Sequence, residues 1–439
     1  MHELDSLRTG LDGELITPGS AAYDAARRPA LARFHDVRPA AVVSCASVRD
    51  VTRTLAFARH TGTHVVPRAG GHCFAGRSST TGLVLDLSRL NTITVRPGGR
   101  ARIGAGARLA HVYDGLHRYR RTVPAGCGPT VGIAGLTLGG GLGLLGRRHG
   151  LTCDALLGAR VVLADGRVVD CGPDREPELF WALRGAGGGQ FGVVTSLVFA
   201  TVAEPRATRF EARWPEAAAA DVIAGWQDWA PDAPDDLTAN LSLVAEPGRP
   251  PRVVVFGAAL SAAEPVIALL ERLTVREGIK PAIRHQVLTW RDLKRSFAGQ
   301  EPYGAVRTVS RSEFFSRPLP VQAVASLIDE FAAGAVSGRR ELNFTAMGGA
   351  YNRVPADATA FVHRGERFLL EHVARDADQW LSRSWALAHP FASGRVYPNF
   401  PDPDLDDWAA AYHGGNAARL RAVKRGYDPD RLFRFPQAI

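Results

Sequence analysis

Two glycine-rich loops that each carry a nucleophilic side chain are the most informative feature of this sequence. Residues 67–72 are Pro-Arg-Ala-Gly-Gly-His, and residues 125–132 are Ala-Gly-Cys-Gly-Pro-Thr-Val-Gly. Glycine has no Cβ, so backbone N–H groups in such loops can close on a phosphate or on a flat ring. The imidazole of His72 and the thiol of Cys127 can form covalent bonds to a ligand held there. The two loops therefore predict a cofactor that is both cradled and covalently bound.

Each of these side chains also has a purely structural interpretation. A lone loop histidine usually bonds only to backbone, and a cysteine is more often a buried packing residue. Two features favour a ligand site: glycines flank Cys127 on both sides, and Arg68 beside the first turn suits an anionic phosphate or an electron-rich ring. Cys73 follows His72, and we expect it to point away from the ligand. We interpret the remaining cysteines as core residues: Cys45, Cys153 and Cys171.

The glycine run after the second loop also matches a different cofactor motif. Gly141, Gly143 and Gly146 fit the G-x-G-x-x-G pattern of nicotinamide dinucleotide sites, and Asp165 lies nineteen residues after the last glycine. That motif requires a full helix after it, whereas residues 147–150, Arg-Arg-His-Gly, would end a helix within one turn. We therefore interpret the match as accidental.

Composition excludes several classes of protein. The 439 residues are 46% hydrophobic and 22% charged, which is typical of a globular chain of two or three domains. The formal net charge of +9 comes from scattered arginines without a basic block, so we expect no nucleic-acid partner. Five cysteines without a C-x-x-C pair predict neither a metal site nor a disulfide framework. Without a leader pattern or an apolar run of membrane length, we expect a soluble, cytoplasmic protein.

The first 205 residues alternate short apolar runs with helical patterns. We predict strands at 41–43, 65–67 and 83–87, an amphipathic helix over 48–60, and a hairpin over 159–170 around an Asp-Gly turn. The two glycine loops follow such elements directly. This arrangement predicts a mixed α/β layer with its functional loops at strand ends.

After residue 205 glycine becomes scarcer and the pattern changes. Predicted strands alternate with alanine-rich helices, at 208–214, 252–256 and 341–347 for the strands and at 217–229, 262–273 and 321–333 for the helices. Turn-rich sequence returns from about residue 385. We therefore divide the chain into three parts: 1–205, 206–384 and 385–439.

The order and spacing of these motifs resembles the flavin-linked oxidases of the berberine-bridge-enzyme-like group, which carry a vanillyl-alcohol-oxidase/PCMH-type FAD-binding domain. The resemblance extends over nearly the whole chain and includes residues 68–78, 86–90, 127–143, 164–166, 180–185, 191–195, 397–400 and 427–429. It implies an α+β fold with a two-part FAD-binding domain over 1–205. A substrate-binding domain with an antiparallel sheet covered by helices would span 206–384, and segment 385–439 would return to the FAD-binding domain.

The resemblance also implies the cofactor and its contacts. In this family the first-loop histidine is bonded to the flavin 8α carbon, and a cysteine of the later loop often to C6. Cys127 lies four residues before Val131, one more than in most relatives, so attachment through His72 alone and attachment through both residues remain open. The implied FAD-binding residues are Arg68, Ala69, Gly70, Gly71, His72, Gly76, Arg77, Ser78, Cys127, Thr130, Val131, Gly132, Gly135, Gly140, Gly143, Gly192, Val194, Tyr397 and Asn399.

One departure from the family concerns catalysis. Alcohol- and sugar-oxidising relatives have Tyr-x-Asn-Tyr where this chain has Tyr-Pro-Asn-Phe, and Phe400 cannot accept a proton. The base must then come from elsewhere, and a tyrosine serves only with a lowered pKa or a proton-accepting partner. The nearest candidates are Tyr351 and Tyr397, then His363 and His389. Alternate residues on a strand share one face, so we expect the substrate site to be lined by Glu341, Asn343, Thr345 and Met347.

From this resemblance we expect an oxidase that moves hydride from a small organic or natural-product substrate to flavin N5, with O2 reduced to H2O2. Two alternatives remain. The first is a flavin dehydrogenase with another electron acceptor, and the second is a non-catalytic flavin-binding protein in which Phe400 marks lost chemistry. The sequence specifies neither the substrate nor the oligomeric state.

Overall fold

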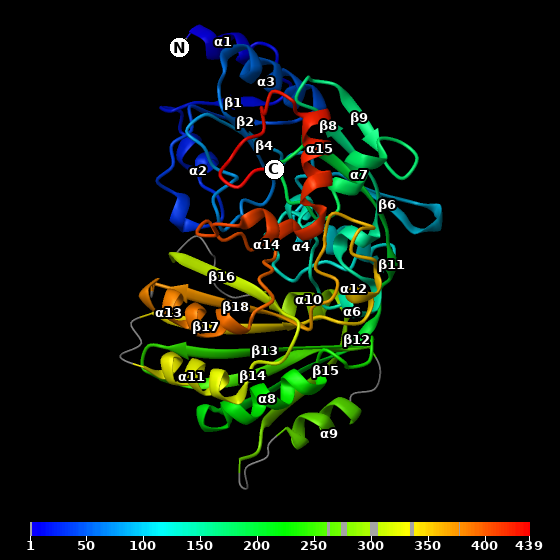
Figure 1. The fold of residues 1–439 in the computed structure, drawn as a ribbon. Helices are drawn as coiled ribbons and strands as arrows, with labels where there is room; N and C mark the ends of the chain where they lie inside the picture. Colours follow the sequence, from blue (N-terminus) through cyan, green and yellow to red (C-terminus); the bar gives the residue numbers. More distant parts are fainter. Residues whose placement is uncertain (1, 261–263, 274–278, 299–305, 334–337, 377) are drawn as a thin grey trace.

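The structure is a computed structural model that describes residues 2–260, 264–273, 279–298, 306–333, 338–376 and 378–439. The chain forms two halves stacked on each other (Figure 1). One half contains a four-stranded and a five-stranded sheet, and the other contains a seven-stranded antiparallel sheet with helices. This is the α+β architecture that the family resemblance implies.

The four-stranded sheet carries the first glycine loop. Its order is β1 (Glu14–Ile16), β2 (Ala41–Ser44), β4 (Leu83–Asp86) and β3 (Val65–Arg68), with β2, β4 and β3 parallel. Helix α3 (Val48–Thr61) joins β2 to β3. Ser47 and Asp50 form a capping box at its start, and Gly62 ends it with a left-handed φ of 67°. Because β3 ends at Arg68, residues 69–72 leave the sheet at its carboxyl edge.

The five-stranded sheet supports the second loop. Its order is β5 (Ile93–Arg96), β6 (Arg100–Gly104), β10 (Val193–Ala200), β8 (Leu156–Val162) and β9 (Val168–Cys171). The predicted hairpin is present as β8 and β9. Shorter elements of this half are α1 (His2–Arg8), α2 (Tyr23–Arg27), α4 (Leu109–His117), β7 (Arg121–Thr122), α5 (Ile133–Leu138), α6 (Gly146–His149), α7 (Pro177–Ala182) and β11 (Val202–Ala203). Since α6 has only four residues, the glycine run does not open a dinucleotide-binding helix.

The seven-stranded sheet has the order β15, β12, β14, β13, β17, β18 and β16. Its strands are β12 (Arg206–Pro215), β13 (Leu237–Glu246), β14 (Arg249–Ala259), β15 (Ala282–Thr289), β16 (Thr308–Phe315), β17 (Arg339–Ala346) and β18 (Phe368–Arg375). The helices of this half are α8 (Ala219–Trp229), α9 (Glu264–Arg272), α10 (Trp290–Ser296), α11 (Val321–Ala332), α12 (Ala350–Arg353) and α13 (Asp378–Ala388).

The two faces of this sheet differ in character because strand residues alternate. On β17, Leu342 and Phe344 are buried in the apolar core shared with α8, α11 and α13, whereas Glu341 and Asn343 are only partly buried. The register aligns Ser242 with Asn343 and Asn343 with Glu371 across β13, β17 and β18. The side of the sheet away from the helices is therefore polar.

The C-terminal segment returns to the first half. Helix α14 (Trp408–His413) is followed by α15 (Ala417–Tyr427), which contacts α7 and lies beside it in Figure 1. The buried Lys424 ammonium pairs with Asp428 at 2.7 Å and donates to the backbone oxygens of Gln190 and Phe433. The end of the chain is thus tied to the loop before β10.

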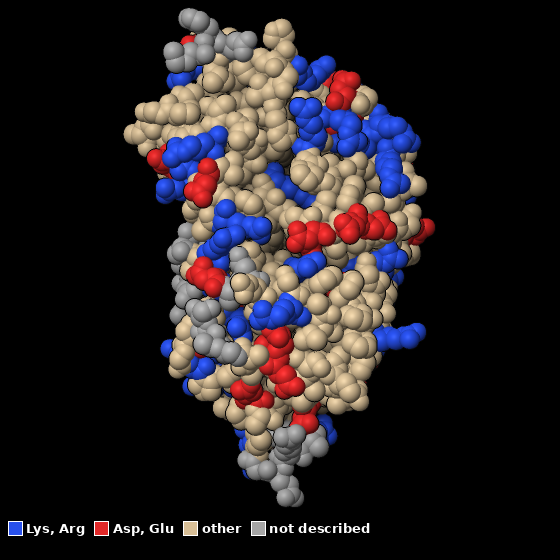
Figure 2. Space-filling view, turned by 60° about the vertical axis from the view of Figure 1, so that its left-hand side comes forward, with Lys and Arg blue, Asp and Glu red and all other residues tan. Residues whose placement is uncertain are grey.

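Charged side chains are mixed in sign on the face drawn in Figure 2, where basic groups lie beside acidic ones. This distribution agrees with the scattered arginines of the sequence. Within the described ranges, no helix combines the length and the apolar character needed to cross a bilayer.

Candidate cofactor site

The two glycine loops touch each other backbone to backbone. A Cβ on Gly70 would lie 2.2 Å from the Gly132 nitrogen, and a Cβ on Gly132 would lie 2.5 Å from the Gly70 nitrogen. No real Cβ fits at such distances, so both positions require glycine. The contact joins the end of β3 to the start of α5, and a cavity opens beside it.

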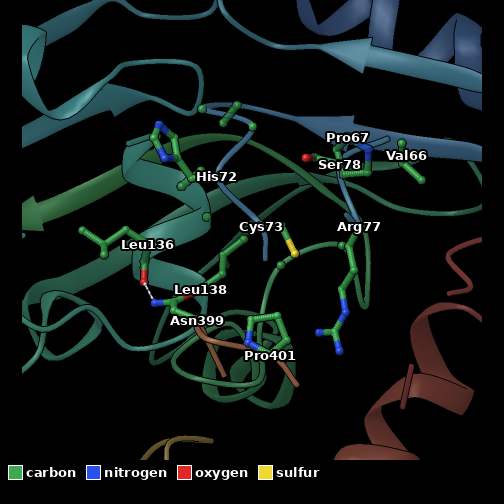
Figure 3. Close-up of a pocket in the computed structure, with 18 of the residues that line it drawn as sticks. Val66, Pro67, His72, Cys73, Arg77, Ser78, Leu136, Leu138, Asn399 and Pro401 are labelled. Atoms are coloured by element: carbon green, nitrogen blue, oxygen red, sulfur yellow. Dashed lines mark hydrogen bonds between the residues drawn. The ribbon is translucent and has the colours of Figure 1, made fainter. Parts of the chain in front are cut away.

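This cavity has the size of a ligand site and enclosing walls from both loops. Its volume is about 320 Å³, within the range of about 300–1,000 Å³ that is usual for ligand pockets. In Figure 3, His72 and Leu136 lie at one end, and Val66 and Arg77 lie at the other. Twelve of the predicted FAD-binding residues line it: Ala69, Gly70, Gly71, His72, Arg77, Ser78, Val131, Gly132, Gly135, Gly192, Val194 and Asn399.

Other predicted cofactor residues lie behind the wall and shape it. The Arg68 guanidinium donates to the carbonyl oxygens of Arg27, at 2.8 Å, and Ala26, so it fixes α2 rather than a ligand. A Cβ on Gly76 would lie 2.6 Å from the Phe34 ring. These two residues are packing positions of the first loop.

The same holds for the second loop and the glycine run after it. A Cβ on Gly140 would lie 2.9 Å from the Phe361 ring, and a Cβ on Gly143 would lie 2.2 Å from the Ala125 oxygen. Thr130 also lies outside the cavity lining, but its hydroxyl oxygen contacts the Nε2 of His72. The glycines at 140 and 143 are therefore explained by close packing of the chain.

His72 lines the cavity as a neutral imidazole. Its Nε2 lies 2.9 Å from the Thr130 Oγ1, which fixes the ring plane. Burial, together with the nearby Arg108 guanidinium, lowers the pKa of His72 to about 4. At neutral pH the neutral form of an imidazole keeps a lone pair on one ring nitrogen. Bond formation to carbon requires this form.

Cys127 lies elsewhere. It is partly buried among an apolar cluster with Leu144, Leu145 and Leu293, and it is not among the residues that line the cavity. Its thiol sulfur lies 3.6 Å from the Lys294 Nζ. The structure thus separates the two nucleophiles that the sequence presents as a pair.

Cys73 differs from its prediction. We expect it from the sequence to point away from the site of His72, yet it lines the same cavity (Figure 3). Neighbouring residues alternate in direction only in an extended strand, and residues 71–79 form turns in which Gly71 and Gly76 have positive φ. Phe74 and Phe400 line the cavity as well, with ring centroids 5.6 Å apart.

The two predicted catalytic tyrosines hold backbone rather than facing the cavity. The Tyr351 hydroxyl donates to the Gly143 oxygen at 2.7 Å and accepts from the Gly143 nitrogen at 3.0 Å. The Tyr397 hydroxyl accepts from the nitrogens of Gly141 and Leu142 at 3.0 and 3.2 Å. Burial raises the pKa of both, that of Tyr397 to about 12. Neither lines the cavity, so this geometry does not favour them as bases.

The histidine candidates are displaced as well. His363 is buried between Phe314 and Phe361, and burial lowers its pKa to about 3. The Nδ1 of His389 lies 2.8 Å from Glu313, next to the Trp385 ring. Neither histidine is part of the cavity lining.

Glu371, which the sequence reasoning missed, is the carboxylate that lines the cavity. It projects from β18, and its Oε1 accepts from the Ser310 hydroxyl at 2.6 Å. Burial raises the pKa of Glu371 to about 7, with a further rise from Glu341, although hydrogen bonds from Ser310 and Asn343 act in the opposite direction. The signal was available, since residues 368–375 form an apolar strand with a single acidic residue.

Two of the predicted substrate residues of β17, Asn343 and Glu341, are bonded to each other: the Asn343 Nδ2 donates to the Glu341 Oε2 at 3.3 Å. Asn343 also accepts from the Ser242 hydroxyl at 2.6 Å and hydrogen-bonds to Glu371. Glu341 shares its face but pairs with Arg339 at 2.5 Å and with Arg375 at 3.6 Å. Thr345 is partly buried on that face. Met347 lies beyond the end of the strand.

Met347 is a core residue, contrary to its prediction. Its exposed fraction is 0%, and it packs with Tyr351, Phe361 and Tyr397. The strand ends at Ala346, so the alternation that would place Met347 beside Asn343 no longer applies.

Four linked side chains do face the half of the molecule that carries the glycine loops. We name them the polar row: Ser242, Asn343, Glu371 and Ser310.

In the described part of the chain, no group of three or more His, Cys, Asp or Glu side chains is arranged to hold a metal ion. The cavity itself has a glycine-lined floor with the neutral His72, and the carboxylate of Glu371 lies above it.

Two family models match the chain. The model described as FAD binding domain covers residues 39–172, and the model described as berberine and berberine like covers residues 396–439. Among curated proteins, the FAD-linked oxidoreductase YgaK of Bacillus subtilis is 33% identical over 98% of both chains. The chitooligosaccharide oxidase of Gibberella zeae is 30% identical over 91% of this chain and 87% of its own.

Solved structures agree with this assignment. The BBE-like 1 protein of Physcomitrella patens superposes with a TM-score of 0.91 at 26% identity, covering 100% of this chain and 98% of that one. The xylooligosaccharide oxidase of Myceliophthora thermophila, solved in complex with xylobiose, gives a TM-score of 0.88 at 26% identity, with 100% and 99% covered. The chain belongs to the berberine-bridge-enzyme-like family of FAD-linked oxidoreductases.

Proposed function

We propose that this FAD-linked oxidoreductase is an oxidase that removes hydride from a carbon of a small hydroxylated substrate held between FAD and Glu371. The observation that carries the proposal is the position of Glu371. Its carboxyl group lines the same cavity as His72 and Asn399, and it has the raised pKa expected of a general base.

The residues around the cavity fit FAD. Arg77 lines it, and the Arg77 Nε is buried without a hydrogen-bond partner in the described residues, as expected of a group that awaits an anion such as a pyrophosphate. Gly70, Gly71 and Gly132 allow close approach of backbone N–H groups. When bound, FAD supplies the hydride acceptor and the reaction with O2.

His72 is the proposed covalent attachment point. It lies in the cavity wall, is neutral near pH 7, and is held by Thr130. Cys127 lies outside the residues that line the cavity, and its thiol is next to Lys294 instead. We therefore favour a single covalent bond, through His72.

Glu371 would take the proton that leaves the substrate as hydride is removed. Above pH 7 its carboxylate is mostly ionised, and the Ser310 hydroxyl and the Asn343 amide orient it. Buried among strand residues, the carboxylate needs no reorganisation of water to accept a proton. This arrangement replaces the tyrosine that the family motif would have placed at Phe400.

The polar row supports a proposal for the substrate class. Hydroxyl and amide groups spaced across four neighbouring strands can bond to a molecule that carries several hydroxyl groups. The chitooligosaccharide and xylooligosaccharide oxidases among the relatives support the same class. A sugar or a hydroxylated natural product is thus the proposed substrate.

Two measurements test the proposal. The pellet of acid-precipitated protein should retain yellow flavin in the wild type and lose it in His72→Ala. With a panel of oligosaccharides and hydroxylated aromatic compounds, one substrate should bleach the flavin anaerobically and yield H2O2 in air. Bleaching without oxygen uptake would instead assign a dehydrogenase, and a flavin that no compound bleaches would support a non-catalytic binding protein.

A further inference from the structure

Lys294 stands out from the other cationic residues of the chain. Of 53 lysines and arginines, only residues 280, 294 and 424 are lysine. Lys294 is 3% exposed at the end of the first turn of α10. Its ammonium donates to the backbone oxygens of Ala125 at 2.7 Å and Gly126 at 3.0 Å, and it lies 3.6 Å from the Cys127 sulfur.

Lys294 differs from the other buried lysine in its partners. Lys424 is neutralised by Asp428 at 2.7 Å, whereas no carboxylate among the described residues pairs with Lys294. Its remaining neighbours are the rings of Tyr113 and Trp290. Burial accordingly lowers the pKa of Lys294, with the thiol of Cys127 acting in the opposite direction. A larger fraction of this amine is therefore neutral than on an exposed lysine.

The choice of an amine at this position calls for a chemical reason. An arginine offers more donors for backbone carbonyls, and the chain uses arginine almost everywhere else. What a guanidinium cannot do is lose a proton and become a nucleophile. A deprotonated lysine beside a sulfur atom can.

Cys127 is suited to be the other half of a reactive pair. Its thiol is partly buried and reduced, and it lies outside the cavity that would bind FAD. The thiols of Cys45 and Cys153 contact the Val43 oxygen and the Asp154 carboxylate instead of an amine. Among the described residues, Cys127 is the cysteine placed next to a lysine.

We propose that Cys127 and Lys294 are a peroxide-sensitive modification site that closes to a covalent sulfur–nitrogen bond. In the first step the thiol attacks H2O2: an S–O bond forms, the O–O bond breaks, and water leaves. In the second step the neutral amine attacks the sulfenic acid: an S–N bond forms, the S–O bond breaks, and a second water carries away the proton. Sulfur is oxidised, one peroxide is reduced to two waters, and the protein loses two hydrogen atoms. Two equivalents of an added thiol reverse the bond and leave as a disulfide.

The bond would connect the two halves of the molecule. Lys294 belongs to the half with the seven-stranded sheet, and Cys127 belongs to the loop that continues to Val131 and Gly132 in the cavity wall. Closure would fix that wall relative to the polar row. The source of peroxide rests on the proposed oxidase activity, but the chemistry of the pair requires only added H2O2.

The test uses the purified FAD-loaded protein, treated with H2O2, alkylated and digested. We expect a cross-linked pair of peptides containing Cys127 and Lys294, with a mass about 2 Da below the sum of the two. Dithiothreitol should abolish it. Cys127→Ser should give none, and Cys73→Ser, which changes the cysteine inside the cavity, should leave the yield unchanged.

Lys294→Arg is the decisive control, because it keeps a cation for the two carbonyls. It should give no cross-link, and Cys127 should then be trapped as sulfenic acid by dimedone. If Lys294→Arg does not fold, its thermal unfolding will show this, and the wild-type digest still decides. Absence of the cross-linked peptides in peroxide-treated wild type, a product heavier by an oxygen, or flavin attached to Cys127 would each overturn the proposal. Failure of substrate turnover with the cross-link present would instead count against the proposed oxidase.

Discussion

The floor and the ceiling of the cavity are built in opposite ways. The floor consists of loops in which the backbone itself is the binding surface, with Gly70 and Gly132 in contact and one neutral His72. The ceiling is a regular sheet that contributes one side chain to the cavity lining, Glu371, which is linked to the rest of the polar row. A floor of backbone tolerates almost no change of residue, whereas a ceiling of side chains can change its chemistry without changing its fold. We infer that the floor fixes the cofactor and the ceiling sets the substrate and the base.

The largest expected effect belongs to the ceiling. Glu371→Gln keeps the shape of the side chain but removes the proton acceptor, so the rate of flavin reduction should fall by about 10²–10⁴-fold. Flavin content should not change, because the floor is intact. Anaerobic stopped-flow reduction measures the rate, and absorbance of the loaded protein gives the content. A variant that keeps the wild-type rate would remove Glu371 from catalysis.

Met347, a buried residue that follows β17, should affect stability and not the rate. Met347→Ala opens a cavity among Tyr351, Phe361 and Tyr397, and should lower the free energy of unfolding by about 2–5 kcal/mol. The KM of the folded fraction should stay unchanged. Denaturant unfolding and steady-state kinetics test both parts. Asn343→Ala is the matched comparison on the same strand, and it should alter kinetics more than stability.

Two floor glycines separate packing from cofactor binding. In Gly132→Ala the new Cβ meets the Gly70 nitrogen, so the protein should lose about 1–3 kcal/mol of stability with or without FAD. A Cβ on Gly135 meets nothing within 4 Å and projects from a residue of the cavity wall. Gly135→Ala should therefore keep its stability before flavin is added and bind less flavin. Equal effects in the two variants would contradict this distinction.

The smallest effect on the rate of flavin reduction is expected at Tyr351, which the sequence predicts as a catalytic base. Tyr351→Phe removes two hydrogen bonds, to the Gly143 oxygen and from the Gly143 nitrogen, and should reduce stability by about 1–3 kcal/mol. Flavin reduction should proceed at the wild-type rate. A large loss of rate at unchanged stability would restore the tyrosine as the base.

These contrasts also explain what the sequence could predict. The loops were recognisable because backbone binding leaves a local trace: the glycines and His72 must follow one another in the chain. The single strands, helices and the hairpin were predictable for a similar reason, since hydrophobic periodicity and turn residues are local. The α+β architecture was implied by the resemblance to the family.

Contacts between distant segments were not predictable in this way. Glu371 reaches the cavity from a strand almost 300 residues after the first loop, and only the sheet register places it beside Asn343. Tyr351 and Tyr397 have the right chemistry but are used to hold the glycine run. The prediction for Met347 was wrong because β17 ends one residue before it, so the alternation on which the prediction depended does not reach Met347.

The central claim is that a carboxylate on the ceiling serves the cofactor on the floor. The most direct test is the rate of anaerobic flavin reduction by a substrate, measured from pH 5 to pH 9. Because burial raises the pKa of Glu371 to about 7 and only its ionised form accepts a proton, the rate should rise with pH through about 7 and then level off. In Glu371→Gln this step should disappear. A rate that does not depend on pH in the wild type, or a step that persists in Glu371→Gln, would contradict the account.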